Sequence, residues 1–291
     1  MSGYAVLVQP FVDFAFMRRA LVAIVALAVG SAPIGCLLVL RRMSLLGDAI
    51  SHALLPGAAL GYLVAGFSLV AMSGGGFVAA LVVALLSAAV TRTTTQREDA
   101  SFAAFYLIAL ALGVLLISTR GSSVDLVRVL FGSILAVDDP ALLMIATVAS
   151  ATLLALAWMY RPLVLECFDP AYLRAVGGGG PAVHVALLVL TVANLVAGFQ
   201  ALGTLMSVGL MILPAVAARF WASEVWSLGV AAGLIALLAG VGGLLLSYHR
   251  ELPAGPSIVL VAGAIYVASI VAGRRGGLLA RASRRRRWRG A

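Results

Sequence analysis

The chain is dominated by long apolar runs that short polar segments separate. A transmembrane helix needs about 20 mostly apolar residues. Such runs occur at 20–40, 49–67, 76–91, 102–118, 140–160, 183–203, 207–221, 225–247 and 256–273. The run at 207–221 is short and contains Pro214, so we expect a broken or partial span there. No run alternates apolar and polar residues, which excludes a transmembrane β-barrel. The pattern predicts an all-α, multi-pass membrane protein with eight or nine transmembrane helices.

The composition agrees with this pattern. Of the 291 residues, 63% are hydrophobic and 11% are charged, against about 45–50% and 25% in soluble domains. These proportions exclude a cytosolic enzyme, a disordered chain and a nucleic-acid-binding module. Arg18 and Arg19 precede the first apolar run as in a signal peptide, but the run continues to Leu40. We therefore interpret it as an uncleaved first helix.

The arginines predict the orientation of the helices. All 20 basic residues are arginine, and eight of them follow residue 273. With nine spans and the C-terminus inside, 15 arginines lie on the cytoplasmic side and five outside, as the positive-inside rule favours. We expect a transmembrane domain at 1–273 and an Arg-rich cytoplasmic tail at 274–291, beside anionic lipid headgroups. Nothing else in the chain supports nucleic-acid binding.

One polar loop, residues 161–182, has the features of a docking element. It contains an aspartate–proline helix start, a short amphipathic stretch and a glycine run. The predicted orientation places this loop in the cytoplasm. We expect the glycine clusters at 74–76 and 177–180 to form turns or hinges. Cys36 and Cys167 lack a CxxC spacing and are expected to be free thiols.

The strongest candidate for chemistry is a pair of ionisable residues at the start of the second run. Asp48 and His52 are four residues apart, which places both on one face of a helix. A carboxylate and an imidazole suit a divalent cation such as Zn²⁺ or Mn²⁺. Two ligands make a poor site, whereas a two-fold dimer would supply four. From the spacing alone, a helix start near the interface where His52 is only hydrogen-bonded is the more common arrangement.

Other polar residues favour structural roles. Asn194 is expected to make an interhelical hydrogen bond, and His184 is expected at the membrane interface. Gly57 and Gly61 form a small-xxx-small pair that indicates close helix packing. The chain has no lysine, so it has no Walker A motif, and it contains neither HExxH nor GxSxG. Energy for active transport would therefore come from a partner or from an ion gradient.

Several separated motifs carry a family resemblance. RRMSLLGDAISHALLPGAALGYL (41–63) closely resembles the signature of the membrane permease subunits of zinc/manganese-class ATP-binding-cassette (ABC) importers, the ABC-3 family. Further matches follow in family order and extend the resemblance from about residue 16 to 273: REDASFA, LFGSILAV, CFDPAYLRAVG, GLMILPAVAARF and SYHRELPAGPSIVLVAGAIY.

The resemblance implies a transporter subunit, not an enzyme. It implies import of zinc or manganese into the cytoplasm across the cell membrane by a dimer of permeases. A separate cytoplasmic ATP-binding subunit would bind and hydrolyse ATP, and an extracytoplasmic solute-binding protein would deliver the metal. The chain itself would hold no cofactor. The family's pathway residues carry over to Asp48 and His52, and its coupling helix carries over to Asp169, Arg174 and Gly177. The GGGGP sequence after this helix departs from the family pattern.

Two alternatives remain open from the sequence. One is a permease for an iron chelate or a cobalamin-like ligand, in which a wider apolar path would replace direct ion ligation by Asp48. The other is an intramembrane metalloenzyme that uses Asp48 and His52, although a third protein ligand and a catalytic base are not recognisable. The sequence does not separate zinc, manganese and ferrous iron, because nitrogen and oxygen ligands accept all three.

Overall fold

The computed structural model describes residue 4 and residues 7–66, 68–119 and 137–280, and these fold into helices. The helices are α2 (Gln9–Asp13), α3 (Ala15–Leu40), α4 (Leu46–Ala65), α5 (Leu69–Thr93), α6 (Glu98–Thr119), α8 (Asp139–Phe168), α9 (Pro170–Ala175), α10 (Gly180–Leu202), α11 (Thr204–Ala218), α12 (Val225–Arg250) and α13 (Ala254–Ala272). Eight of them are long and apolar enough to cross a membrane, and α11 is a shorter apolar helix. The prediction of an all-α protein with eight or nine spans is confirmed.

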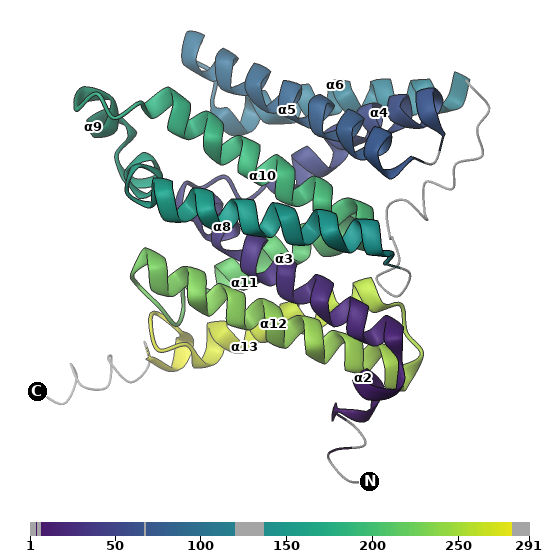
Figure 1. Cartoon of the computed structure of the whole chain (residues 1–291). Helices are drawn as coiled ribbons and strands as arrows, with labels where there is room; N and C mark the ends of the chain where they lie inside the picture. The colour runs from purple at the N-terminus through teal and green to yellow at the C-terminus, as the bar shows by residue number, and fades with distance from the viewer. Residues whose placement is uncertain (1–3, 5–6, 67, 120–136, 281–291) are drawn as a thin grey trace, which may run out of the picture.

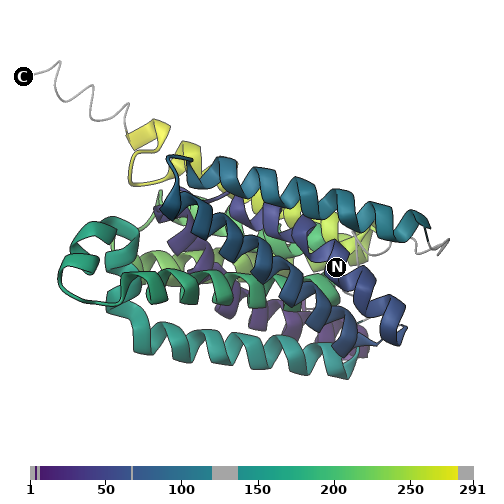
Figure 2. The ribbon, with the colours of Figure 1, turned by 90° about the horizontal axis from the view of Figure 1, so that it is seen from above.

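The first span, α3, lies in the middle of the bundle. Figure 1 shows α4, α5 and α6 on one side of it and α12 and α13 on the other, with α8, α10 and α11 between them. Figure 2 shows the same helices from above, with their axes roughly aligned. One apolar core joins α3 to α11, α12 and α13, and a second joins α3 to α4, α5, α6 and α10. α3 therefore takes part in both cores, while the absence of cleavage stays a prediction.

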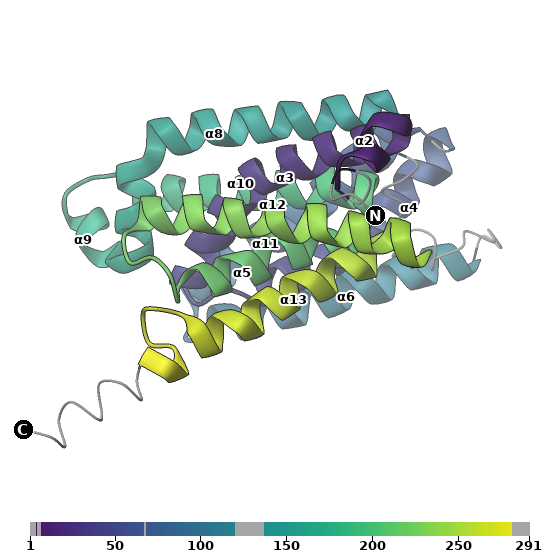
Figure 3. The same cartoon turned by 90° about the horizontal axis from the view of Figure 1, so that it is seen from below.

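Different helix termini lie at the two ends of the bundle. In Figure 3, α2 lies at one end, and α9 lies at the other with the C-terminal end of α13. At the α2 end, Arg19 forms a 3.0 Å ion pair with Asp139 at the start of α8. At the α9 end, Arg41 reaches Glu166 on α8. Helix ends that the arginine pattern assigns to one side of the membrane therefore lie at one end of the bundle.

The helix pair α4–α5 is packed through glycines. A Cβ atom on Gly57 would collide with the carbonyl oxygen of Gly75, and one on Gly61 would collide with that of Ala71. The predicted close packing at Gly57 and Gly61 is confirmed. The turn predicted at residues 74–76 is wrong, because these glycines lie inside α5. Gly75 lets the α4 backbone approach, because a Cβ atom there would collide with the Gly57 carbonyl oxygen, a use that small residues have in membrane helices.

Two proline-containing segments differ from the predicted spans. The span expected at 140–160 continues to Phe168, with a kink at Met159 where φ is −102° and ψ is 17°. Pro162 explains the kink, since it lacks an N–H and its ring crowds the preceding turn. The predicted partial span at 207–221 is the 15-residue helix α11, which contains Pro214. Gly203 alone separates it from α10, with φ of 85° and ψ of 163°, a conformation that favours glycine.

Candidate metal site and coupling helix

Asp48 and His52 lie next to each other on one face of α4. Asp48 is in the first turn of the helix, and its Oδ1 atom is 3.7 Å from Nε2 of His52. The Asp48 side chain is 66% exposed in the single chain and that of His52 is 31% exposed. The imidazole stacks on Tyr106 of α6, with ring centroids 6.0 Å apart. The structure therefore brings the predicted pair together and leaves both groups accessible.

The pair opens onto two clefts. A cleft of about 330 Å³ is lined by Asp48, Ser51 and His52 of α4 and by residues of α11 and α13. A second cleft, of about 230 Å³, lies between α4 and α6 and includes Asp48 and Asp99. Asp48 thus lines both clefts. A cation in either cleft would find a carboxylate oxygen in the lining, which is the ligand type that hard and borderline divalent ions accept.

A single chain supplies an incomplete coordination sphere at this position. Within the described ranges, no group of three or more His, Cys, Asp or Glu side chains is arranged to hold a metal ion. Asp48 and His52 therefore provide two ligands, and further ligands would have to come from water or from a second molecule. The arrangement suits transient binding better than a permanent structural metal, which normally has four protein ligands.

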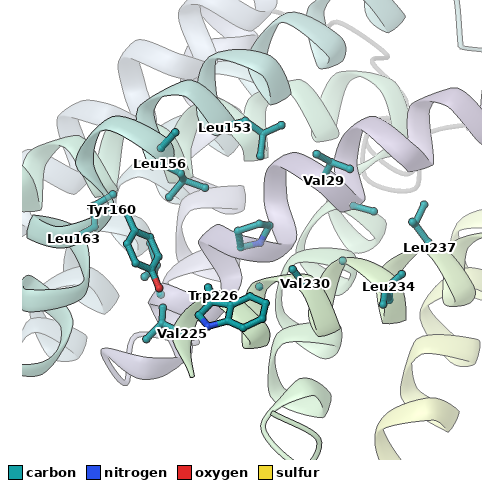
Figure 4. A pocket seen from close by; sticks show the side chains of 16 residues that line it. Val29, Leu153, Leu156, Tyr160, Leu163, Val225, Trp226, Val230, Leu234 and Leu237 are labelled. Atoms are coloured by element: carbon teal, nitrogen blue, oxygen red, sulfur yellow. The ribbon is translucent and has the colours of Figure 1, made fainter. Parts of the chain in front are cut away.

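A third cleft has a different chemistry. It measures about 710 Å³ and lies between α3, α8 and α12. Figure 4 shows its lining of aliphatic side chains with Tyr160 and Trp226. Asp48 and His52 are not among the residues that line it. Because it offers almost no ligand atoms, we do not assign an ion path to it.

The short helix predicted in the 161–182 loop is present as α9. Asp169 caps its N-terminus, since its Oδ1 accepts a 2.9 Å hydrogen bond from the Tyr172 backbone N–H, and Pro170 occupies the first helical position. Arg174 lies in the last turn. Gly177 follows the helix with φ of 70°, which glycine adopts without strain. The predicted helix start and the glycine turn after it are confirmed, while the role of Asp169, Arg174 and Gly177 in coupling stays a prediction.

The structure also places the other polar residues that the sequence singled out. Asn194 donates a 2.7 Å hydrogen bond to Thr152 Oγ1 on α8, as predicted. His184 is 3% exposed and lies between Glu98 and Glu166, while its position at the membrane interface stays a prediction. Its partners come from α6 and α8, and sequence spacing carries no signal for contacts across three helices. The LFGSILAV segment lies outside the described residues, except for Val137.

The fold and these sites define a class of protein: a multi-pass helical permease with a short helix that projects at one end. The model of the ABC 3 transport family matches residues 13–273, and the chain belongs to this family. The resemblance found in the sequence motifs is confirmed.

Related proteins cover almost the whole chain. The manganese import system permease protein ScaB of Streptococcus parasanguinis is 33% identical over 267 residues, which are 90% of this chain and 94% of that protein. The chelated iron transport system membrane protein YfeD of Yersinia pestis is 31% identical over 268 residues, covering 92% and 89%. The solved structure of PsaBC from Streptococcus pneumoniae in complex with Fab superposes with a TM-score of 0.82 at 31% identity, covering 94% of this chain and 97% of that one.

Proposed function

We propose that this chain is the permease subunit of an ABC importer that carries divalent metal ions into the cytoplasm, with manganese as its cargo. The observation that carries the proposal is the Asp48–His52 pair, whose side chains line a cleft between α4, α11 and α13. The names of relatives such as ScaB favour manganese among the ions that these ligands accept.

The chemistry of the pair suits passage of an ion. One carboxylate oxygen and one imidazole nitrogen bind Mn²⁺, Zn²⁺ or Fe²⁺ through ligand types that all three accept. A conducting site must bind strongly enough for entry and weakly enough for release. Two ligands in each chain meet this condition, because the ion keeps water or leaves when the helices move. A second permease copy would place an identical pair across a two-fold axis and complete a four-ligand site.

The energy for transport would come from a separate subunit. We propose that α9 docks on a cytoplasmic ATP-binding subunit, with Asp169 holding the helix start, Arg174 at its exposed end and Gly177 shaping the turn after it. An extracytoplasmic solute-binding protein would deliver the metal at the opposite end of the bundle. With α9 in the cytoplasm, we infer that the Arg-rich segment 274–291 also lies on the cytoplasmic side, as the positive-inside rule favours.

Uptake of radioactive manganese tests the proposal. The permease is expressed in cells with its ATP-binding subunit and its solute-binding protein, and D48A and H52A are compared with the wild type. We expect both variants to reduce uptake to the level of cells without the permease, because each removes half of the ligand pair. The matched control is S51A. Ser51 lines the same cleft, but its hydroxyl donates a 2.7 Å hydrogen bond to the Asp48 backbone carbonyl within α4, so S51A should retain wild-type uptake.

One outcome of this uptake experiment would contradict the proposal. Wild-type manganese uptake by D48A and H52A, with both proteins present in the membrane, would show that the pair does not contact the ion.

A second candidate function is import of chelated iron, which the name of YfeD favours. In that case the cells would accumulate iron from a chelate and D48A would matter little, because the chelator and not the protein would hold the metal. Measuring manganese, zinc and chelated-iron uptake in the same cells separates the two functions.

A further inference from the structure

Four charged or titratable side chains meet at the α9 end of the bundle. Arg41 follows α3, Glu98 begins α6, Glu166 lies in the last turn of α8 and His184 lies near the start of α10. Their side chains are 16%, 22%, 6% and 3% exposed, respectively. Buried charges are costly unless they are paired, so this cluster is a feature that the fold maintains at a cost. Neither the ligand pair on α4 nor the cap of α9 requires it.

The contacts within the cluster fall into two kinds. One part of the cluster, Glu166 and His184, lies on α8 and α10, the helices before and after α9. The other part is Arg41, just before α4, and Glu98, the first residue of α6. The two shorter contacts cross between these parts: Arg41 Nη1 to Glu166 Oε1 at 3.0 Å, and His184 Nε2 to Glu98 Oε1 at 3.3 Å. The two longer contacts stay within each part, and both measure 3.8 Å: Arg41 Nη2 to Glu98 Oε2, and His184 Nδ1 to Glu166 Oε1.

We propose that these four residues form an ionic clasp that couples movement of α9 to α4 by exchanging partners. In the closed clasp, the two crossing contacts hold the segments around α9 against Arg41 and Glu98. In the open clasp, Arg41 pairs with Glu98, and His184 pairs with Glu166. The inference rests on the proposed function, because it takes α9 to be the element that the ATP-binding subunit moves.

Partner exchange explains why the clasp can open. Removing one partner of a buried ion pair leaves an uncompensated charge, which is strongly destabilising. Here each carboxylate has a second partner within 4 Å on its own side, so neither is left alone when the parts separate. In addition, Nδ1 of His184 is buried and makes no hydrogen bond within the described structure. It faces Glu166 and would gain a partner in the open clasp.

Arg41 provides the link to the proposed metal ligands. It begins the short connection from α3 to α4, and Asp48 lies in the first turn of α4. The next residue, Arg42, has a φ of 63°, a left-handed conformation that a non-glycine residue adopts at a cost. A strained connection tends to relax when its anchor is released. Opening of the Arg41–Glu166 contact would therefore free the start of α4, which carries Asp48.

The test measures transport and ATP hydrolysis separately in the complete importer. The permease, its ATP-binding subunit and its solute-binding protein are reconstituted in liposomes, and manganese ions imported per ATP hydrolysed are counted. We expect E166Q and R41M to retain the bound ATP-binding subunit and to hydrolyse ATP, but to import about tenfold fewer ions per ATP, within the usual range of coupling energies. The double variant should lose no more than the worse single variant, because both changes remove the same contact.

The matched control is the exposed ion pair between Arg19 and Asp139 at the other end of the bundle, which has the same 3.0 Å separation. D139N should leave the number of ions per ATP unchanged. If E166Q fails to assemble, E98Q breaks the second crossing contact and carries the test with the same expected result. A wild-type ratio in the assembled clasp variants, or an equal loss in D139N, would overturn the clasp. If the wild-type complex itself imports no metal ion, the proposed function, and not the clasp, would be overturned.

Discussion

The packing of α4 against α5 gives a prediction that two adjacent glycines can test. A Cβ atom on Gly75 would lie closer than 3.0 Å to the Gly57 carbonyl oxygen, whereas one on Gly74 would meet no atom within 4 Å. Alanine at either position gains up to about 1 kcal/mol in helix propensity. At Gly75 the collision forces the helices apart, and overpacking of this kind costs about 1–3 kcal/mol. G75A should therefore be less stable than G74A by about 1–3 kcal/mol.

Thermal unfolding of the purified permease, followed by tryptophan fluorescence, measures this difference. A stability change of 1 kcal/mol moves the Tm of a protein of 150–250 residues by about 2–4 °C, so G75A should melt about 2–12 °C below G74A. The comparison isolates packing because both variants share the same change in helix propensity. G74A itself should melt at or above the wild-type temperature. Equal melting temperatures for G75A and G74A would refute the close approach of α4 and α5.

Two further changes test local interactions. D169A removes the N-cap of α9, which costs about 1 kcal/mol of helix stability, and it should weaken binding of the ATP-binding subunit in a pull-down. D169N keeps a capping oxygen and should bind normally. Equal binding by D169A and D169N would show that the capped helix is not needed for docking. T152V removes the acceptor for Asn194 and should lower stability by about 0.6 kcal/mol, typical of interhelical hydrogen bonds in membranes. S150A is its control, since that hydroxyl bonds only within its own helix, and equal melting temperatures for the two would contradict the assigned role of the bond.

Several features could be predicted because they depend on residues close together in the sequence. Hydropathy located the eight long apolar helices and the shorter α11 of the described residues, since an apolar run can be recognised wherever the other helices lie. The Asp48–His52 pair is set by a four-residue spacing on one helix. The Asp169–Pro170 sequence predicted the start of α9, because an aspartate cap and a proline at the first position act on the adjacent turn.

The predictions that failed depend on distant residues. A row of three glycines at 74–76 has the composition of a turn, yet it lies inside α5 because α4 packs against it there. The predicted span ended at residue 160, but the helix continues past a kink to Phe168. The burial of His184 against carboxylates from α6 and α8 was not predicted either, because it depends on residues far away in the sequence.

The sequence by itself determined which segments enter the membrane, which end of the chain carries the positive charge and which two ligands share a turn of helix. These properties follow from composition and short spacing, which each segment carries without its neighbours. Only the tertiary structure decided that Arg41, Glu98, Glu166 and His184 meet, and that Asp48 lines two clefts. Contacts between helices are set by the shapes and small residues of the packed faces, and sequence separation gives no measure of them.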